Sequence, residues 1–527
     1  MSRKLRNGST GNRLSGIGYA VLKTVASDEY DEVSPETTAF LCEDGLADSD
    51  DEVLFEMHYT EEQDDDGKKD KVKDTFTVEE AVESIGIGWF QLRLFVVCGI
   101  ITAADALEML LLAVLSPALR CEWSLEHYQV ALLTTVVFLG MGIMAPVFGM
   151  SGDKIGRKMT LFIVVVWIGY FGMLTSASPN YTWILILRSL VGAGMGGSPQ
   201  GFALLAEYVP SKYRARLLIS GQIFWASGSM FEMFLAAMVI PTLGWRWLLV
   251  LSAIPIVIAL FFLCFIPESA RFLVAAGRHE EALNALQKAA KINNSSLPKG
   301  RLVQAEAVEV ERGKVSDLFN KNYLRSTLQL WLLWFGTAFS YYGMVLASAE
   351  ILRVESEKNS DACKCSYLTA DDYRTMIIST LGEFICLPVN WLLIDRVGRR
   401  ITGTVNLSGC GLFFILLQIP VSRSVLTGFM FAVRGFSAAT FNWIYIYSSE
   451  VYPTSIRTLG IGTASSWARV GAMITPFVAQ VLLEASIIAA TWLYGLLCFA
   501  CAITAFLLPI ETKNRIMPQT VAYKRMK

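Results

Sequence analysis

The stretch Gly149-Met150-Ser151-Gly152-Asp153-Lys154-Ile155-Gly156-Arg157-Lys158 is a short charged segment between two long apolar runs. It has a second copy, Ile394-Asp395-Arg396-Val397-Gly398-Arg399-Arg400, which also lies between apolar runs. The glycine before each arginine permits a tight reversal, and such cations gather where membrane helices end at the cytosol. Because a duplicated motif in register with apolar runs is not typical of a chance surface turn, the sequence predicts two related halves.

Two further features repeat at nearly the same spacing. Residues 207–214 and 450–457 both read Glu-x-x-Pro-x-x-x-Arg and are 243 residues apart, close to the 242 residues between the two charged stretches. Arg188 and Arg434, each inside an apolar run, are separated by 246 residues. Three features repeated at spacings of 242 to 246 residues indicate an internal duplication of the kind found in membrane carriers.

Carboxylates and guanidinium groups occupy matching places in these four turns and predict charge networks between helices. Such networks can close one face of a carrier, or they can stabilise the fold without gating; we favour the gate. The residues predicted to form this cytosolic gate are Asp153, Arg157, Glu207, Arg214, Asp395, Arg399, Glu450 and Arg457.

The composition is that of a membrane protein. Of the 527 residues, 53% are hydrophobic and 17% are charged, with a mean hydropathy of +0.45, which is too apolar for a soluble globular chain. Runs of about 20 apolar residues are long enough to cross a bilayer. The predicted spans are 94–115, 129–150, 159–177, 183–205, 217–240, 247–266, 328–349, 376–394, 401–419, 425–447, 459–483 and 487–508. The predicted fold is therefore an all-α membrane protein with twelve transmembrane helices in two pseudo-symmetric six-helix halves.

The distribution of charge divides the rest of the chain. The positive-inside rule places the basic turns, the long middle segment and both tails in the cytosol. Residues 77–85 start with a capping box and have one apolar face, which is typical of an amphipathic helix. The predicted parts are a disordered acidic cytosolic tail at 1–74, an interfacial amphipathic helix at 75–92, the N-terminal half at 93–269, a cytosolic linker at 270–325, the C-terminal half at 326–512 and a cytosolic tail at 513–527.

Three charged residues in the first and fourth spans are candidates for proton coupling. Asp105 and Glu108 share one helix face, and Arg188 lies at a similar depth in the bilayer. Charges at this depth are costly unless they are paired or face a cavity. The functional interpretation is an ion pair that breaks when an acid takes up a proton, and the alternative is a static pair that locks two helices.

The second half contains its own charged residues. Arg469 lies near the middle of the eleventh span, where its planar fork suits a carboxylate or a phosphate. This favours an organic anion as substrate, whereas the alternative is an internal pair between Arg469 and Glu383. Aromatic rings near the expected cavity can stack on a flat solute. The other residues predicted to bind substrate are Glu383, Arg434, Tyr341, Tyr342, Glu232 and Trp225.

The cysteines and the missing motifs narrow the class of protein. Cys121, Cys363 and Cys365 fall in loops predicted on the non-cytosolic side, where a disulfide from Cys121 to one of the other two can persist. The sequence has no clustered metal ligands, no Walker motif and no nucleophile–base set. We therefore expect a carrier and not an enzyme, with no cofactor, no metal and no nucleic-acid partner.

The two halves also end alike, with Pro267-Glu268-Ser269 and Pro509-Ile510-Glu511-Thr512. Together with the repeated motifs, these residues resemble the major facilitator superfamily, near its sugar porters and organic-ion transporters. Trp391, which stands where the first charged stretch has Gly149, is a departure from the pattern. A more specific resemblance, to the synaptic-vesicle-two-related proteins, is carried by residues 77–86, 121–123, 244–247 and 341–343.

The resemblance implies a carrier that moves a small solute by alternating access through a central cavity between the halves. It implies that Asp105 pairs with Arg188 in proton coupling, and that a cation at Arg469 accompanies an anionic substrate. It also implies an intracellular vesicle membrane in preference to the plasma membrane, with cytosolic trafficking partners for the acidic tail. The alternative is a sensor or scaffold of vesicle membranes that keeps the carrier fold without transport.

Overall fold

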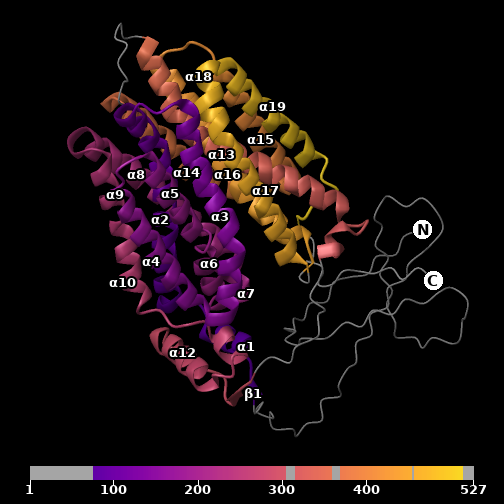
Figure 1. Ribbon diagram of the computed structural model, residues 1–527. Coiled ribbons are helices and arrows are strands. Elements are labelled where there is room, and N and C mark those ends of the chain that lie inside the picture. The colour runs from indigo at the N-terminus through magenta and orange to yellow at the C-terminus, as the bar shows by residue number, and fades with distance from the viewer. Residues whose placement is uncertain (1–74, 304–314, 359–367, 454–455, 514–527) are drawn as a thin grey trace, which may run out of the picture. The chain divides into compact units, whose positions relative to one another are not determined.

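The computed structural model describes residues 75–303, 315–358, 368–453 and 456–513, which belong to one compact unit (Figure 1). Nearly all of this part of the chain is helical, and its two strands, β1 (Thr75–Phe76) and β2 (Arg301–Leu302), have two residues each. Ten helical stretches in the described residues are long and apolar enough to cross a membrane. This confirms the predicted all-α membrane class, although the stretches that meet the criteria number ten and not twelve.

The N-terminal half is a bundle of helices that follow one another with short turns. Its elements are α2 (Trp89–Trp123), α3 (His127–Ile155), α4 (Arg157–Thr175), α5 (Tyr181–Met195), α6 (Pro199–Glu207), α7 (Ser211–Ser220), α8 (Gln222–Leu243), α9 (Trp245–Ser252) and α10 (Ile254–Leu263). Helices α7 and α8 together make one candidate span, and so do α9 and α10.

The C-terminal half is a second bundle. Its elements are α13 (Leu324–Lys358), α14 (Ala370–Val397), α15 (Arg399–Leu416), α16 (Arg423–Val451), α17 (Arg457–Phe477), a π-helical turn (Val478–Leu482), α18 (Leu483–Ala485) and α19 (Ile487–Phe506). Between the two bundles the chain forms α11 (Ala270–Ala275), α12 (His279–Ile292) and a short 3₁₀ helix (Val315–Phe319).

Two of the twelve predicted spans are not among the ten candidate spans of the structure, each for a local reason. The predicted span at 183–205 is broken into α5 and α6, because Pro199 has no N–H group to donate to the preceding turn. The break also packs tightly, since a Cβ atom on Gly197 would lie 2.2 Å from Val164 Cγ2. The predicted span at 401–419 forms α15, whose first residues, Arg399 and Arg400, are charged.

The duplication extends to the packing of backbone on backbone. A Cβ atom on Gly140 of α3 would lie 2.2 Å from the carbonyl oxygen of Ser189 in α5, and one on Gly382 of α14 would lie 2.5 Å from that of Phe431 in α16. Both members of the second contact are 242 residues after those of the first. Only glycine permits so close an approach of two helices, so the same contact is built twice.

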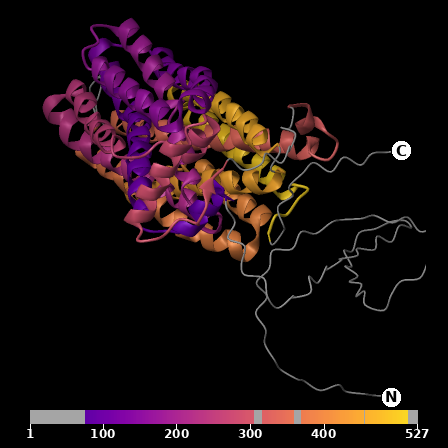
Figure 2. The same cartoon turned by 90° about the horizontal axis from the view of Figure 1, so that it is seen from below.

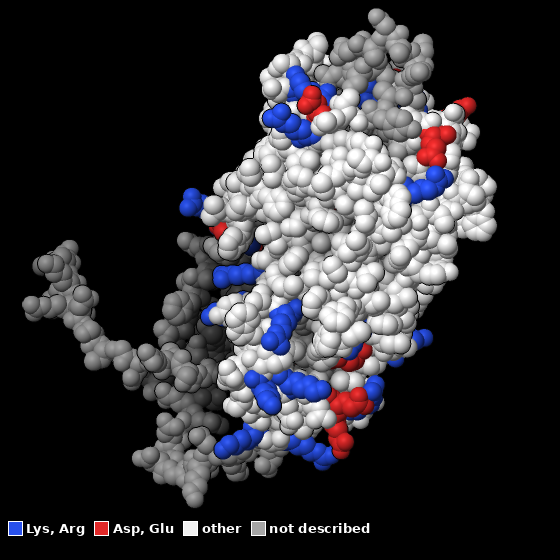
Figure 3. All heavy atoms as spheres, turned by 90° about the vertical axis from the view of Figure 1, so that its left-hand side faces the viewer, with Lys and Arg blue, Asp and Glu red and all other residues white. Residues whose placement is uncertain are grey.

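The two halves lie next to each other when viewed from the α12 end (Figure 2), and they meet through α3 with α17 and α8 with α14. We call the end that carries the charged turns at Asp153 and Asp395 the basic end. Figure 3 shows charged side chains gathered toward the two ends of one face, with a largely uncharged band between them. This is the pattern expected of a surface that lies in a bilayer.

A small assembly covers the basic end of the N-terminal half. Strand β1 pairs in parallel with β2, and α1 (Val78–Ile85) packs on α12. The predicted capping box of α1 is present. The Thr77 side chain accepts from the Glu80 backbone N–H, and the Glu80 carboxylate accepts from the Thr77 backbone N–H. The apolar face of α1 is buried, so protein covers a face that the sequence alone assigned to the membrane interface.

Candidate functional site

Buried charges in the N-terminal half form one close ion pair. Arg188 of α5 donates from Nη1 to Glu108 Oε2 of α2 at 2.7 Å, and both side chains are at most 3% exposed. Asp105, one helical turn nearer the basic end, instead accepts from Ser198 Oγ at 2.9 Å. The three predicted residues therefore gather in one region, but the acid that contacts Arg188 is Glu108, not the Asp105 that the resemblance implied.

Glu232 lies in the interior of the N-terminal half, apart from the central cavity. Its side chain is fully buried in α8, and Oε2 accepts from Ser252 Oγ at 2.9 Å. Oε1 has no hydrogen-bond partner among the described residues. Glu232 is not one of the residues that line the central cavity, so direct contact with a solute there is not supported by the structure.

A central cavity of about 110 Å³ lies between the two halves. Helix α8 forms one wall, and α13, α14 and α16 form the others. The residues that line it are Gln222, Trp225, Ala226, Tyr341, Tyr342, Glu383, Leu387, Ala438, Phe441, Asn442 and Tyr445. Rings dominate this lining, with two amides and one carboxylate among them, as is common in pockets for small organic solutes. Four of the predicted substrate residues, Trp225, Tyr341, Tyr342 and Glu383, are therefore in the wall, whereas Arg434, Arg469 and Glu232 are not among the lining residues.

The carboxylate in the cavity wall is bound to the C-terminal half. Glu383 Oε1 accepts from Arg434 Nε at 2.6 Å, and both side chains are 3% exposed. The same oxygen accepts from the Tyr341 hydroxyl at 3.0 Å. The Arg434 guanidinium also lies 5.4 Å from the centre of the Tyr341 ring, a cation–π distance. Arg434 thus neutralises Glu383, which leaves Arg469 without the partner that the alternative interpretation gave it.

In the described part of the chain, the Arg469 side chain makes hydrogen bonds only to its own helix, α17. Its Nη1 donates to the carbonyl and hydroxyl oxygens of Ser465, one turn earlier in α17. Its Nε is buried without a hydrogen-bond partner among the described residues. The positive charge of Arg469 interacts electrostatically with the hydroxyl groups of Tyr342 and Tyr445. Both tyrosines line the central cavity.

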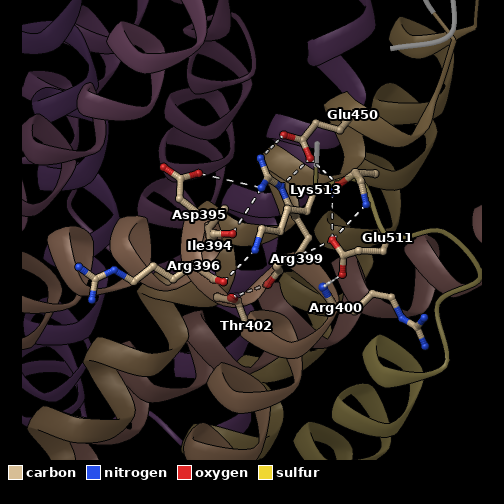
Figure 4. Close-up of polar contacts among 11 residues, drawn as sticks. Ile394, Asp395, Arg396, Arg399, Arg400, Thr402, Glu450, Glu511 and Lys513 are labelled. Carbon is tan, nitrogen blue, oxygen red and sulfur yellow. Dashed lines mark hydrogen bonds and ion pairs between the residues drawn. The ribbon is translucent and has the colours of Figure 1, made fainter. Parts of the chain in front are cut away.

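At the basic end, the second charged turn is a compact network (Figure 4). Arg399 makes two hydrogen bonds to Glu450, from Nη2 at 2.8 Å and from Nε at 2.9 Å, and lies 4.0 Å from Asp395. Glu511 accepts from the backbone N–H groups of Arg399 at 2.8 Å and Arg400 at 3.0 Å. The carboxylate therefore caps the start of α15, where unpaired N–H groups and the helix dipole favour a negative charge.

The first charged turn repeats this arrangement. Arg157 contacts Asp153 at 2.8 Å and Glu207 at 3.4 Å, and Glu268 accepts from the backbone N–H groups of Lys158 at 2.9 Å and Met159 at 3.3 Å. These contacts stay within the N-terminal half, as those of Arg399 stay within the C-terminal half. In the state described, each network therefore ties helices of its own half.

Two of the predicted gate residues bind backbone carbonyls. Arg214 donates to the Val209 carbonyl at 3.2 and 3.3 Å, and Arg457 donates to the Tyr452 carbonyl at 3.3 Å. Both arginines follow the proline of the Glu-x-x-Pro-x-x-x-Arg motif, so the spacing serves to hold the turn. The other pair of turns, between α3 and α4 and between α14 and α15, reverses at Gly156 and Gly398. Their φ values of +102° and +97° favour glycine.

Sequence reasoning missed Glu268 and Glu511 as members of these networks. The signal was present, because both follow a proline at the end of a half and recur 243 residues apart. In the sequence this recurrence indicates the duplication of the two halves and nothing about a contact. Side chains that bind backbone N–H groups leave no charge pattern in the sequence, so their role emerged from the structure.

The halves are joined at the end opposite the basic end. Gln480 donates to Ser116 Oγ at 3.2 Å, Thr135 donates to the Met473 carbonyl at 3.0 Å, and His127 lies 3.9 Å from Glu484. Cys121 of the same end is disulfide-bonded. Its predicted partners, Cys363 and Cys365, lie outside the described residues.

The sequence matches the family described as sugar (and other) transporter over residues 112–520. Human SVOPL is 46% identical over 462 residues, covering 84% of this chain and 94% of that protein. Synaptic vesicle 2-related protein of Xenopus laevis is 45% identical over 452 residues, covering 84% and 82% of the two chains.

Solved structures share the fold. The partially occluded inward open conformation of the xylose transporter XylE from E. coli gives a TM-score of 0.65 at 17% identity, covering 81% of this chain and 99% of that chain. An inward open conformation of XylE gives 0.62 at 15% identity. The family match and these relatives show that the chain is a membrane transporter and not an enzyme. It belongs to the sugar (and other) transporter family of the major facilitator superfamily, with synaptic vesicle 2-related proteins among its relatives.

Proposed function

We propose that this protein is a proton-coupled carrier of a small organic anion in an intracellular vesicle membrane. The observation that carries the proposal is that Arg469 has no carboxylate partner among the described residues. The buried guanidinium groups of Arg188, Arg353 and Arg434 each contact a carboxylate. Among the described residues, Arg469 makes side-chain hydrogen bonds only to Ser465. A cation held at membrane depth without an acid is costly, and an anionic solute would supply the missing charge.

The surroundings of Arg469 indicate what kind of anion fits. Tyr342 and Tyr445, on which its charge acts, belong to a wall that also contains Trp225, Tyr341 and Phe441. Aromatic faces suit a flat or apolar body, while a guanidinium binds a carboxylate or phosphate with two parallel hydrogen bonds. A small anion with a ring or a short apolar part meets both requirements.

Proton coupling is supported by the cluster in the N-terminal half. Glu108 neutralises Arg188, and Asp105 lies one turn away against Ser198. A proton taken up by Glu108 would release Arg188, whose Nε and Nη2 have no hydrogen-bond partner among the described residues. The released guanidinium would then need another acceptor. Asp105 lies on the same helix face as Glu108, and Glu232, which interacts electrostatically with Arg188, has an Oε1 without a hydrogen-bond partner among the described residues. The exchange of partners gives protonation a way to move α5 against α2.

The proposed location follows from the relatives. Several are named synaptic vesicle 2-related proteins, and a vesicle with an acidic lumen supplies a proton gradient. The acidic tail at 1–74, which lies outside the described residues, is proposed to bind cytosolic trafficking partners through its negative charge.

The test is uptake by the purified protein in liposomes. The probes are labelled monocarboxylates, dicarboxylates, phosphate esters and quaternary amines, each offered with and without an inward proton gradient. We expect uptake of an anion that rises with the gradient. Arg469→Ala should lose that uptake, while Arg469→Lys, which keeps the charge without the planar fork, should retain part of it. Asp105→Asn should lose the response to the gradient but keep exchange.

Each outcome separates one part of the proposal from the others. Uptake of amines with Arg469→Ala unaffected would overturn the anion assignment and leave the carrier. Anion uptake indifferent to the gradient would overturn the coupling alone. Silence with every probe, from protein that remains folded, would favour a sensor or scaffold.

A further inference from the structure

A chain of hydrogen bonds crosses from one half to the other at the wall of the central cavity. Trp225 of α8 donates from Nε1 to the Tyr341 hydroxyl of α13 at 2.6 Å. Tyr341 donates to Glu383 Oε1 of α14 at 3.0 Å, and Arg434 of α16 donates to the same oxygen at 2.6 Å. Trp225 belongs to the N-terminal half and the other three to the C-terminal half.

We propose that Tyr341 is a positioning residue for transport, whose hydroxyl makes the closure of the two halves depend on the state of Glu383. This inference rests on the carrier fold and not on the nature of the substrate. It differs from the role given to Tyr341 by its sequence, since a hydroxyl that is occupied on both sides has little capacity left for a solute.

The direction of every bond in the chain is fixed by the chemistry of its members. An indole N–H can only donate, so the Tyr341 oxygen must accept from Trp225. Tyrosine has a single hydroxyl hydrogen, which is then committed to Glu383. Glu383 Oε1 receives two donors, the arrangement that an ionised carboxylate prefers. A change in the charge or hydrogen bonding of Glu383 therefore alters the Tyr341 hydroxyl, which in turn alters its bond to Trp225 of the opposite half.

Burial makes the chain responsive to such a change. Tyr341 and Glu383 are 3% and 2% exposed, so a hydroxyl that loses its acceptor has few alternatives and its orientation must shift. A proton or a hydrogen-bonding solute that reaches Glu383 from the cavity competes for the oxygen that holds Tyr341. Because the halves of such carriers rock against each other, weakening the Trp225 bond favours the state in which the bond is absent.

The experiment measures the populations of the two states without any substrate. Distance labels are attached through non-natural side chains at Lys154 and Arg396, exposed residues of the basic end on opposite halves, in protein reconstituted in nanodiscs. The variants are Tyr341→Phe, Trp225→Phe and the double variant, all of which keep an aromatic ring. The control is Tyr452→Phe, which removes a hydroxyl bonded to Thr327 Oγ1 at 3.1 Å inside the C-terminal half.

We expect each single variant to lower the ratio of the described state to the alternative roughly 2- to 10-fold, the effect of one hydrogen bond. The double variant should match the single variants, because both remove the same bond. Tyr452→Phe should lower the unfolding temperature without moving the ratio. A ratio unchanged in Tyr341→Phe, or effects of the two single variants that add, would overturn the proposal and assign Tyr341 to packing or to the solute.

Discussion

At the scale of single residues, the pair of Arg188 and Glu108 governs the stability of the N-terminal half. Glu108→Ala should lower the free energy of unfolding by about 3 to 5 kcal/mol, since it leaves a buried guanidinium uncompensated. Asp105→Asn should cost less than about 1 kcal/mol, because the amide oxygen can still accept from Ser198. The measurement is reversible unfolding in mixed micelles.

A double variant provides the control for this prediction. Replacing both Glu108 and Arg188 by leucine removes the buried charges together and should recover most of the loss. If Asp105→Asn were as damaging as Glu108→Ala, Asp105 and not Glu108 would be the partner that holds Arg188.

The sequence identified which residues would be charged and buried, but not their pairing. Glu108 and Asp105 lie three residues apart on one face, so periodicity allows either to meet Arg188. The choice depends on where α5 breaks, because the break places Ser198 beside Asp105. Likewise the sequence offered Arg469 as an internal partner of Glu383, whereas in the structure Arg434 of α16 takes that place.

At the scale of helices, the carboxylate of Glu511 holds the start of α15. Burial acts to raise the pKa of Glu511, but hydrogen bonds from the backbone N–H groups of Arg400, Arg399, Lys513 and Thr512 favour the charged form, and the net pKa is lowered. A lowered pKa stabilises the fold at pH values above that of the unfolded carboxylate, about 4.3, and the contribution disappears as the pH falls through the folded value.

Glu511→Gln should therefore lower the free energy of unfolding by about 1 kcal/mol at neutral pH. The difference from the parent protein should shrink as the pH falls below about 4.3. Unfolding followed as a function of pH measures it. Glu280→Gln, at an exposed position of α12, serves as the control and should change stability by less than about 0.5 kcal/mol throughout. A difference for Glu511→Gln that stays constant with pH would contradict the charged cap.

The apolar runs of the sequence predict where the helices lie, and the glycines predict where the chain turns. Gly156 and Gly398 were predicted to permit reversal, and both have positive φ. The sequence did not reveal that the face of α1 with Val78 and Val82 is covered by protein, because an amphipathic pattern is the same whether lipid or α12 covers it.

At the scale of the whole molecule, hydrogen bonds tie the two halves at the end opposite the basic end, in addition to the Trp225–Tyr341 bond at the cavity wall. The bonds of Ser116 to Gln480 and of Thr135 to the Met473 carbonyl both lie away from the basic end, where each charge network stays inside its own half. If the protein works by alternating access, these ties must break in another state of the cycle. On that expectation, the structure is the member of the cycle in which these contacts are made.

A cross-link between Ser116→Cys and Gln480→Cys should hold this member of the cycle. With distance labels at Lys154 and Arg396, the cross-linked protein should show only the separation of the described state, while the untreated double variant should show two. Asn390→Cys with Asn406→Cys is the matched control, since these side chains are bonded at 2.9 Å within the C-terminal half and their cross-link crosses no moving boundary. If the Ser116–Gln480 cross-link left both separations populated, the halves would not rock about these contacts, and the sequence duplication would describe the fold without describing the motion.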